Sequence, residues 1–177
     1  MKTLLSILVV LGLLCGLCYV ISPKINKNLY DPGVYCPFCD PKVLEAQIFY
    51  EDDLVRALYS HKPIYPGHCL IIPKRHVPRF EGLTQAEASQ MMQMIKKVNV
   101  AVQKVFGTSA YLLLQKNGYE VGQSVPHVHF HYIPRKAGDD SEIAFLAHMY
   151  LSTIKKPIST TEMRDVVNEL HEAMPEN

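Results

Sequence analysis

Residues 126–133 read PHVHFHYI, and this stretch decides how the rest of the chain is interpreted. Histidine and apolar side chains alternate along it, which is the period-two pattern of a β-strand. A strand over residues 125–133 places His127, His129 and His131 on one face at successive spacings of about 6.6–7 Å. The residues between them point into apolar packing on the other face. The pattern therefore predicts a row of three imidazoles beside a packed sheet.

Three imidazoles on one face admit two functional interpretations, beside a structural one in which all three are hydrogen-bonded within the fold. The strand could present a metal site, because neutral imidazole is a common zinc ligand. Alternatively, one imidazole is a nucleophile that its neighbours orient. The preceding turn Gly122-Gln123-Ser124 favours the nucleophile, since backbone N–H groups and a hydroxyl there can bind an anion. We therefore expect a phosphate-binding loop beside a nucleophilic strand.

The patterns on either side of the histidines predict an α+β fold with an antiparallel sheet. Further strands are expected over residues 46–51, 54–60, 68–73 and 111–115. A long helix should follow Thr84, which forms a capping box with Glu87, and should end at Gly107. A C-terminal helix, capped by one of the threonines at 160 and 161, should run to Met174.

The N-terminal residues differ from the rest of the chain. Residues 4–21 carry no charge over 18 positions, close to the roughly 20 apolar residues that a membrane-spanning helix needs. We expect residues 1–22 to be a transmembrane anchor; a cleaved signal segment and a buried soluble helix are the alternatives. Residues 23–35 are rich in Pro, Asn and Lys and should be a linker.

The charge balance limits the kinds of partner. The 177 residues carry a formal net charge of +1, and the largest basic cluster is Lys74-Arg75-His76 with Arg79 beyond it. Binding of nucleic acid needs many clustered Lys and Arg side chains. We therefore expect no nucleic-acid partner, whereas a small anionic ligand fits this composition.

Two stretches together resemble the histidine-triad (HIT) superfamily: GQSVPHVHFHYI, residues 122–133, and PGHCLIIPKRH, residues 66–76. The resemblance covers residues 36–140 and is strongest to the fragile-histidine-triad branch, which hydrolyses diadenosine polyphosphates. It implies a HIT fold, a nucleotide substrate, a homodimer and catalysis that needs no cofactor. Residues 141–177 remain as a C-terminal helical extension.

The resemblance also implies roles for individual residues. His129 matches the nucleophile that takes the nucleotidyl group from the α-phosphate, and His127 and His131 match the histidines that orient it. Ser124 matches a position in the loop that contacts the phosphate and the leaving group. The remaining expected substrate contacts are Gln123, Asn117, Ser60, His68 and Gly122.

Two positions depart from the family pattern. Ser60 stands where members usually carry Asp or Asn for the ribose, and Lys116 stands where the diadenosine-hydrolysing branch has an uncharged amide. Alternatives to a dinucleoside polyphosphate hydrolase are a phosphoramidase and a nucleotidyl transferase or phosphorylase of the same fold. A nucleotide-binding module with little turnover also stays open, on the evidence of Ser60.

Cys36 and Cys39 form a C-x-x-C with the spacing of half a tetrahedral zinc site. Resemblance to zinc-binding bacterial members implies that His76 and His127 complete a structural zinc site. A disulfide or a pair of free thiols is the alternative. Reduced thiols and the supply of nucleotides favour the cytoplasmic side of the membrane for the catalytic domain of the anchored protein. Lysines at both ends of the apolar segment leave the orientation of that segment open.

Overall fold

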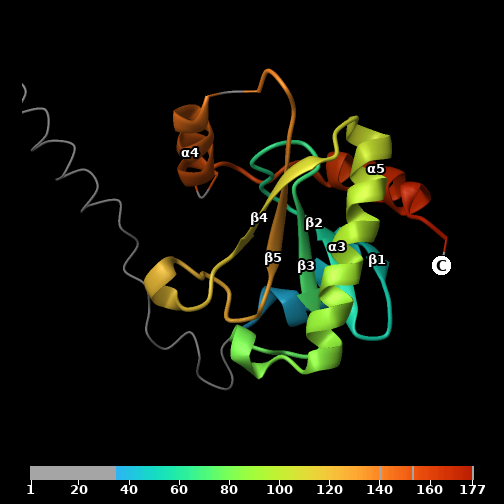
Figure 1. Ribbon diagram of the computed structural model, residues 1–177, viewed down its shortest axis with the longest axis vertical. Helices are drawn as coiled ribbons and strands as arrows, with labels where there is room; N and C mark the ends of the chain where they lie inside the picture. The colour runs from blue at the N-terminus through green and yellow to red at the C-terminus, as the bar shows by residue number, and fades with distance from the viewer. Residues whose placement is uncertain (1–34, 140, 153, 177) are drawn as a thin grey trace, which may run out of the picture.

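The computed structural model describes residues 35–139, 141–152 and 154–176, in which a five-stranded sheet packs against one long helix (Figure 1). The strands are β1 (Ile48–Glu51), β2 (Val55–Tyr59), β3 (Cys69–Pro73), β4 (Ala110–Gln115) and β5 (Phe130–Arg135). Their order across the sheet is β1-β2-β3-β5-β4, and every neighbouring pair is antiparallel. The α-helices are α2 (Pro41–Gln47), α3 (Gln85–Phe106), α4 (Glu142–Leu151) and α5 (Thr160–Ala173). Short 3-10 turns are η2 (Pro37–Cys39), η3 (Phe80–Gly82) and η4 (Tyr119–Val121).

The main core lies between the sheet and helices α3 and α5. Figure 1 shows α3 lying along β2 and β3, which it contacts. Met91 and Val98 of α3 and Leu170 of α5 are fully buried in this core. Burying one such side chain contributes about 1.5–3 kcal/mol relative to leaving it exposed. Helix α5 therefore completes the core on which the sheet rests.

The opposite face of the sheet carries a smaller apolar cluster, which we call the N-terminal cluster. Because side chains alternate along a strand, Leu58 of β2 points to this face while Ala57 and Tyr59 point to the main core. Its buried members are Cys36, Phe38, Leu44, Leu58, Leu70 and Ile72. Residues 36–44 thus cover the face of the sheet that α3 leaves open.

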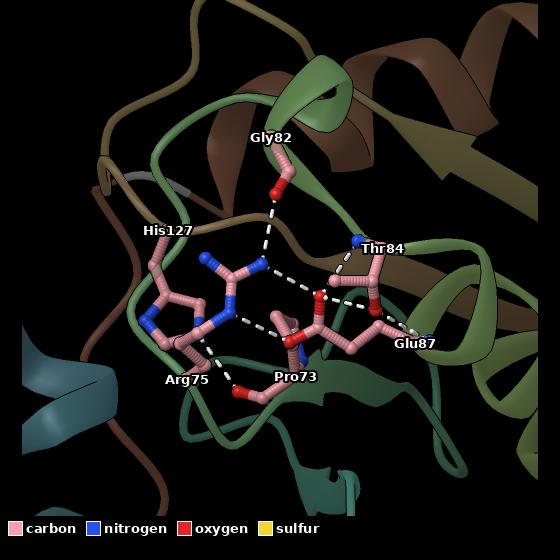
Figure 2. Close-up of polar contacts among 6 residues, drawn as sticks. All are labelled: Pro73, Arg75, Gly82, Thr84, Glu87 and His127. Atoms are coloured by element: carbon pink, nitrogen blue, oxygen red, sulfur yellow. Dashed lines mark hydrogen bonds and ion pairs between the residues drawn. The ribbon is translucent and has the colours of Figure 1, made fainter.

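An ion pair between the half-exposed Arg75 and the buried Glu87 joins the loop after β3 to the start of α3 (Figure 2). Glu87 is the third helical residue, and its carboxylate accepts from the Thr84 backbone N–H at 2.8 Å while the Thr84 hydroxyl accepts from the Glu87 N–H, completing the predicted capping box. The Arg75 guanidinium donates to both carboxylate oxygens at 2.9 and 2.7 Å and also to the Gly82 carbonyl at 2.8 Å. The pairing fixes where α3 begins relative to the sheet.

We expect Glu87→Gln to lower the free energy of unfolding by about 1 kcal/mol at pH 7, because the charge-assisted hydrogen bonds to Arg75 are lost while solvent screens the half-exposed guanidinium. The Arg75 guanidinium holds the pKa of Glu87 at about 2, below its value of 4.5 in an unfolded chain. A depressed carboxyl pKa stabilises the fold above pH 4.5, and this contribution disappears as the pH falls through about 2. Urea unfolding of both forms between pH 7 and 2 should therefore show converging stabilities. Glu169→Gln, at an exposed site on α5, should change little; a constant difference at all pH values would contradict this assignment.

The histidine-bearing strand and the C-terminal region differ in part from the sequence-based prediction. β5 begins at Phe130 and not at residue 125, because residues 123–129 follow an irregular path that ends the loop after η4. Helix α4 was not predicted, since its residues are apolar on several sides and give no periodic stripe. Helix α5 begins one residue after its cap Ser159, close to the predicted start.

The predicted transmembrane segment needs correction. Within residues 35–139, 141–152 and 154–176, no helix combines the length and apolar character needed to cross a bilayer. Residues 1–22, to which the anchor was assigned, lie outside the described residues. The transmembrane segment predicted before the α+β fold, and the membrane-anchored location inferred from it, are therefore not supported.

Candidate active site

The three histidines share the face of the sheet that lies opposite α3. Leu70 of the N-terminal cluster pairs with His131 in the register of β3 and β5, so both side chains point to this face. Val128 and Tyr132 are fully buried in the main core on the other side. The alternation predicted from the sequence thus holds through residues 127–132, although only part of this stretch is regular strand.

His129 is buried, with 5% of its surface exposed. Its Nδ1 lies 2.7 Å from the carbonyl oxygen of His127. A carbonyl only accepts hydrogen bonds, so Nδ1 carries the proton and Nε2 holds the free lone pair. Burial lowers the pKa of His129 below its ordinary value of 6.5, which keeps the ring neutral at pH 7. A neutral imidazole with a bare Nε2 is the form that can act as a nucleophile.

A second pair of histidines lies beside it. His68 Nε2 lies 3.0 Å from His131 Nδ1, and the Ile64 backbone N–H donates to His68 Nδ1 at 3.2 Å. The backbone donor fixes His68 Nδ1 as an acceptor, so His68 Nε2 donates to His131 Nδ1 and His131 carries its own proton on Nε2. Burial lowers the pKa of His68 to about 3 and that of His131 to about 2. The ring of His131 meets that of His129 edge-on, with centroids 4.9 Å apart.

The side chain of His127 belongs to a different cluster. Its Nε2 lies 2.9 Å from the carbonyl oxygen of Pro73, as Figure 2 shows, so Nε2 is the protonated nitrogen. The free Nδ1 points to Cys36 Sγ at 3.5 Å and to Cys39 Sγ at 3.6 Å. His76 Nδ1 lies 3.4 Å from Cys39 Sγ. In the predicted row of three imidazoles, those of His129 and His131 therefore contact each other, whereas that of His127 faces the cysteines.

The donor set Cys36, Cys39, His76 and His127 fits a tetrahedral metal ion, and its four ligand atoms lie within 4.8 Å of one another. In a zinc site, Zn–S bonds of about 2.3 Å and Zn–N bonds of about 2.0–2.1 Å at tetrahedral angles hold S and N about 3.5 Å apart. The three S···N distances given above, between 3.4 and 3.6 Å, match that separation. The protonated Nε2 of His127 on a backbone carbonyl is the outer-shell arrangement typical of metal-binding histidines.

The loop before the histidines is held by side-chain amides. Gln123 is 1% exposed, and its Oε1 accepts from the Gly118 N–H at 2.7 Å. Its Nε2 donates to the carbonyls of Pro78 and Val125 at 2.9 and 3.0 Å. The Gln123 side chain thus holds the loop together, and its contact with a substrate stays a prediction.

Asn117 is engaged in the same way. Its Oδ1 accepts from the Phe80 N–H at 2.8 Å, and its Nδ2 donates to both carboxylate oxygens of Glu81 at 3.0 Å. Exposed Ser124 and partly exposed Gly122, with φ of +81°, remain on the outer side of the loop. Buried Ser60 accepts weakly from the Lys62 N–H at 3.4 Å.

Two residues near the histidines were not among the predicted site residues. The ammonium of Lys116 lies 3.5 Å from the point where a side chain on Gly122 would begin, and its charge adds to the burial that lowers the pKa of His129 and His131. Phe38, within the C-x-x-C, contacts His129 with ring centroids 5.3 Å apart. The only feature of the sequence that pointed to a role for Phe38 is its position between two candidate metal ligands.

The family model of the HIT domain matches residues 42–138 of this chain. The chain belongs to the HIT-domain family. The HIT fold and the family membership predicted from the histidine-bearing strand are thus confirmed.

Named relatives of this HIT-domain protein include enzymes. It is 45% identical over 97 residues to bis(5'-nucleosyl)-tetraphosphatase (asymmetrical) of Schizosaccharomyces pombe, covering 55% of this chain and 53% of that protein. It is 33% identical over 135 residues to bis(5'-adenosyl)-triphosphatase of Dictyostelium discoideum, covering 76% and 90%. The crystal structure of the C. elegans NitFhit protein superposes with a TM-score of 0.61 at 31% identity, covering 73% of this chain and 27% of that one. The HIT-domain protein thus spans about half the length of the S. pombe relative.

Proposed function

We propose that this HIT-domain protein hydrolyses dinucleoside polyphosphates through a covalent nucleotidyl intermediate on His129. The observation that carries the proposal is the hydrogen bond from His129 Nδ1 to the His127 carbonyl, which leaves a buried and neutral Nε2 free. Relatives named bis(5'-nucleosyl)-tetraphosphatase and bis(5'-adenosyl)-triphosphatase support this class of substrate.

The proposed reaction has two displacements at the α-phosphorus. In the first, the Nε2 lone pair of His129 forms an N–P bond while the bond to the bridging oxygen breaks, and the rest of the polyphosphate leaves with that electron pair. In the second, water forms a P–O bond, the N–P bond breaks, and nucleoside monophosphate departs while the water proton passes to solvent. Splitting one displacement in this way lowers the barrier. His131 and His68, whose rings are hydrogen-bonded to each other, support the ring of His129 on one side.

The loop contributes by shape and charge. Ser124 and the backbone around Gly122 are proposed to stabilise charge that develops on the phosphate oxygens, with the Lys116 ammonium close by. Because the amides of Gln123 and Asn117 are engaged within the protein, we assign them the role of shaping the loop that receives the phosphates. Ser60 is proposed to contact the ribose, and His68 to act through His131.

We further propose that Cys36, Cys39, His76 and His127 bind a structural zinc ion, on the basis of their fit to tetrahedral geometry. Zinc there would cross-link residues 36–39 to the loop after β3 and to the histidine stretch. The proposed chemistry at His129 uses side chains alone. In this proposal the HIT domain comprises residues 36–140, and the C-terminal extension 141–177 supplies α5 to its core.

We also propose a homodimer formed through β4. This strand lies at the edge of the sheet and exposes Tyr111, Leu112 and Leu113, each 37–40% exposed. An apolar edge strand with unpaired backbone groups tends to pair with another strand. Sedimentation equilibrium should therefore give twice the chain mass for the wild type and a shift toward monomer for Leu112→Lys.

An assay with purified full-length protein tests the proposed activity. Diadenosine tetraphosphate, diadenosine triphosphate and adenosine phosphoramidate are supplied separately in ¹⁸O-labelled water, and products are followed by mass spectrometry. We expect faster turnover of the dinucleotides, with ¹⁸O in the nucleoside monophosphate. Faster phosphoramidate turnover would indicate a phosphoramidase, and diphosphate formed on adding inorganic phosphate would indicate a phosphorylase. Tight nucleotide binding without turnover would indicate a nucleotide-binding module.

A further inference from the structure

Phe38 lies between the two clusters that divide the histidines. It is 7% exposed, although it belongs to a turn close to the start of the described chain. Its ring meets the ring of His127 edge-on at 5.8 Å and that of His129 at 5.3 Å between centroids. One aromatic ring thus contacts both a candidate metal ligand and the proposed nucleophile.

The turn that carries Phe38 is held by short backbone hydrogen bonds. The Cys39 N–H donates to the Cys36 carbonyl at 3.0 Å, and the Asp40 N–H donates to the Pro37 carbonyl at 3.3 Å. Both cysteine sulfurs face His127 from this turn, while the Phe38 ring packs with the N-terminal cluster. A ligand that joins the two cysteines to the histidines therefore also fixes where the Phe38 ring lies.

His129 needs support beyond its hydrogen bond. The bond from Nδ1 to the His127 carbonyl sets the tautomer, but a single hydrogen bond constrains the tilt of an imidazole weakly. The ring of His131 packs against one part of the ring at 4.9 Å, and Phe38 packs against another at 5.3 Å. These contacts together restrict the direction in which Nε2 points.

We propose that Phe38 is a positioning residue for His129 and that metal binding at Cys36, Cys39, His76 and His127 keeps it in place. The metal cluster and the nucleophile are then connected twice: through the main chain of His127, whose carbonyl accepts from His129, and through the Phe38 ring. The kinetic part of this inference rests on the proposed function, since it takes His129 as the nucleophile. The structural part, that Phe38 orders the His129 ring, does not depend on activity.

The test compares Phe38→Leu with Phe49→Leu as a matched control, because Phe49 is 2% exposed and packs in the main core, on the opposite face of the sheet from His129. For each protein we would measure kcat and KM with diadenosine tetraphosphate, bound zinc per chain and the melting temperature. The ¹H–¹⁵N NMR signal of the His129 Nδ1–H reports directly on the ring. If Phe38→Leu does not fold, Phe38→Met, which lacks a rigid ring, replaces it with the same expected results.

We expect Phe38→Leu to lower kcat roughly 10- to 100-fold with KM within about 2-fold of the wild type, since small displacements of a reacting group have effects of this size. Bound zinc should stay at the wild-type level, and the His129 Nδ1–H signal should broaden and exchange faster with water. Phe49→Leu should lower the melting temperature and leave both kcat and the NMR signal unchanged.

Three outcomes would overturn the inference. The first is an unchanged kcat and NMR signal in Phe38→Leu. The second is a raised KM with full kcat, which would make Phe38 a substrate contact. The third is an equal loss of kcat in the Phe49→Leu control. If the wild type hydrolyses none of the nucleotides, the proposed function fails separately, and the NMR signal of Phe38→Leu alone decides between an ordered and a disordered His129 ring.

Discussion

Replacing His129 with alanine is expected to reduce hydrolysis of diadenosine polyphosphates by at least about 10³-fold, because the proposed mechanism has no second nucleophile. The side chain hydrogen-bonds to the His127 carbonyl and contacts Phe38 and His131, whereas both apolar clusters are built from other residues, so the variant should remain folded. Initial rates with wild-type protein, His129→Ala and His171→Ala measure the effect. His171 is exposed on α5 and bonds to the Phe49 carbonyl, and its replacement should leave the rate unchanged.

Direct detection of the intermediate strengthens this experiment. In rapid-quench mass spectrometry, the wild type should gain the mass of one adenylyl group, located on the peptide that contains His129. The His129→Ala protein should gain none, even at high enzyme concentration. Turnover of the alanine variant at the wild-type rate, or an adduct on another residue, would rule out His129 as the nucleophile.

The second large effect is expected at the cysteine–histidine cluster. Cys39→Ser should lose bound zinc and become less stable by at least about 3 kcal/mol, because metal binding to a preformed site adds directly to folding free energy. That loss corresponds to a drop in melting temperature of roughly 10 °C for a domain of this size. A strong chelator should produce a similar drop in the wild type and none in the variant.

Cys69→Ala provides the matched control for the cysteine experiment. Cys69 is buried in β3, where its thiol donates to the Gly67 carbonyl and packs in the main core, away from the cysteine–histidine cluster. Its replacement should leave the zinc content and the response to chelator unchanged. A disulfide would instead be identified if wild-type protein refolded in the presence of zinc binds no zinc. Its mass would then be two units lower, because Cys36 and Cys39 are oxidised to each other.

Local pattern was sufficient for part of the site and insufficient for the rest. Alternation correctly placed residues 127–132 relative to the core, because a side chain's face depends on its immediate neighbours. The direction in which the His127 ring turns depends on Pro73 and on Cys36, which are 54 and 91 residues away in the chain. Periodicity carries no information about such partners: the C-x-x-C spacing suggested the two cysteines of the metal cluster, and resemblance to a family suggested its two histidines.

The amide side chains illustrate the same limit. Resemblance to the family predicts that Gln123 and Asn117 touch the substrate, which stays a prediction; it gave no sign that their amides also hydrogen-bond to the Gly118, Pro78 and Phe80 backbone. A motif shows which residue types a site contains and not which of their atoms face the ligand. The strand boundary at Phe130 was displaced for a related reason, since the Gln123 network shapes the chain before regular pairing begins.

The Gln123 network also has a thermodynamic consequence for ligand recognition. Because the buried Gln123 amide sets the loop conformation by accepting one hydrogen bond and donating two, the loop is ordered when the protein folds and not when a ligand arrives. Association of a phosphate group there then involves little loss of backbone entropy. A calorimetric titration should show nucleotide binding with a heat-capacity change that reflects only the surface buried by the ligand, without the larger change that accompanies coupled folding of a loop.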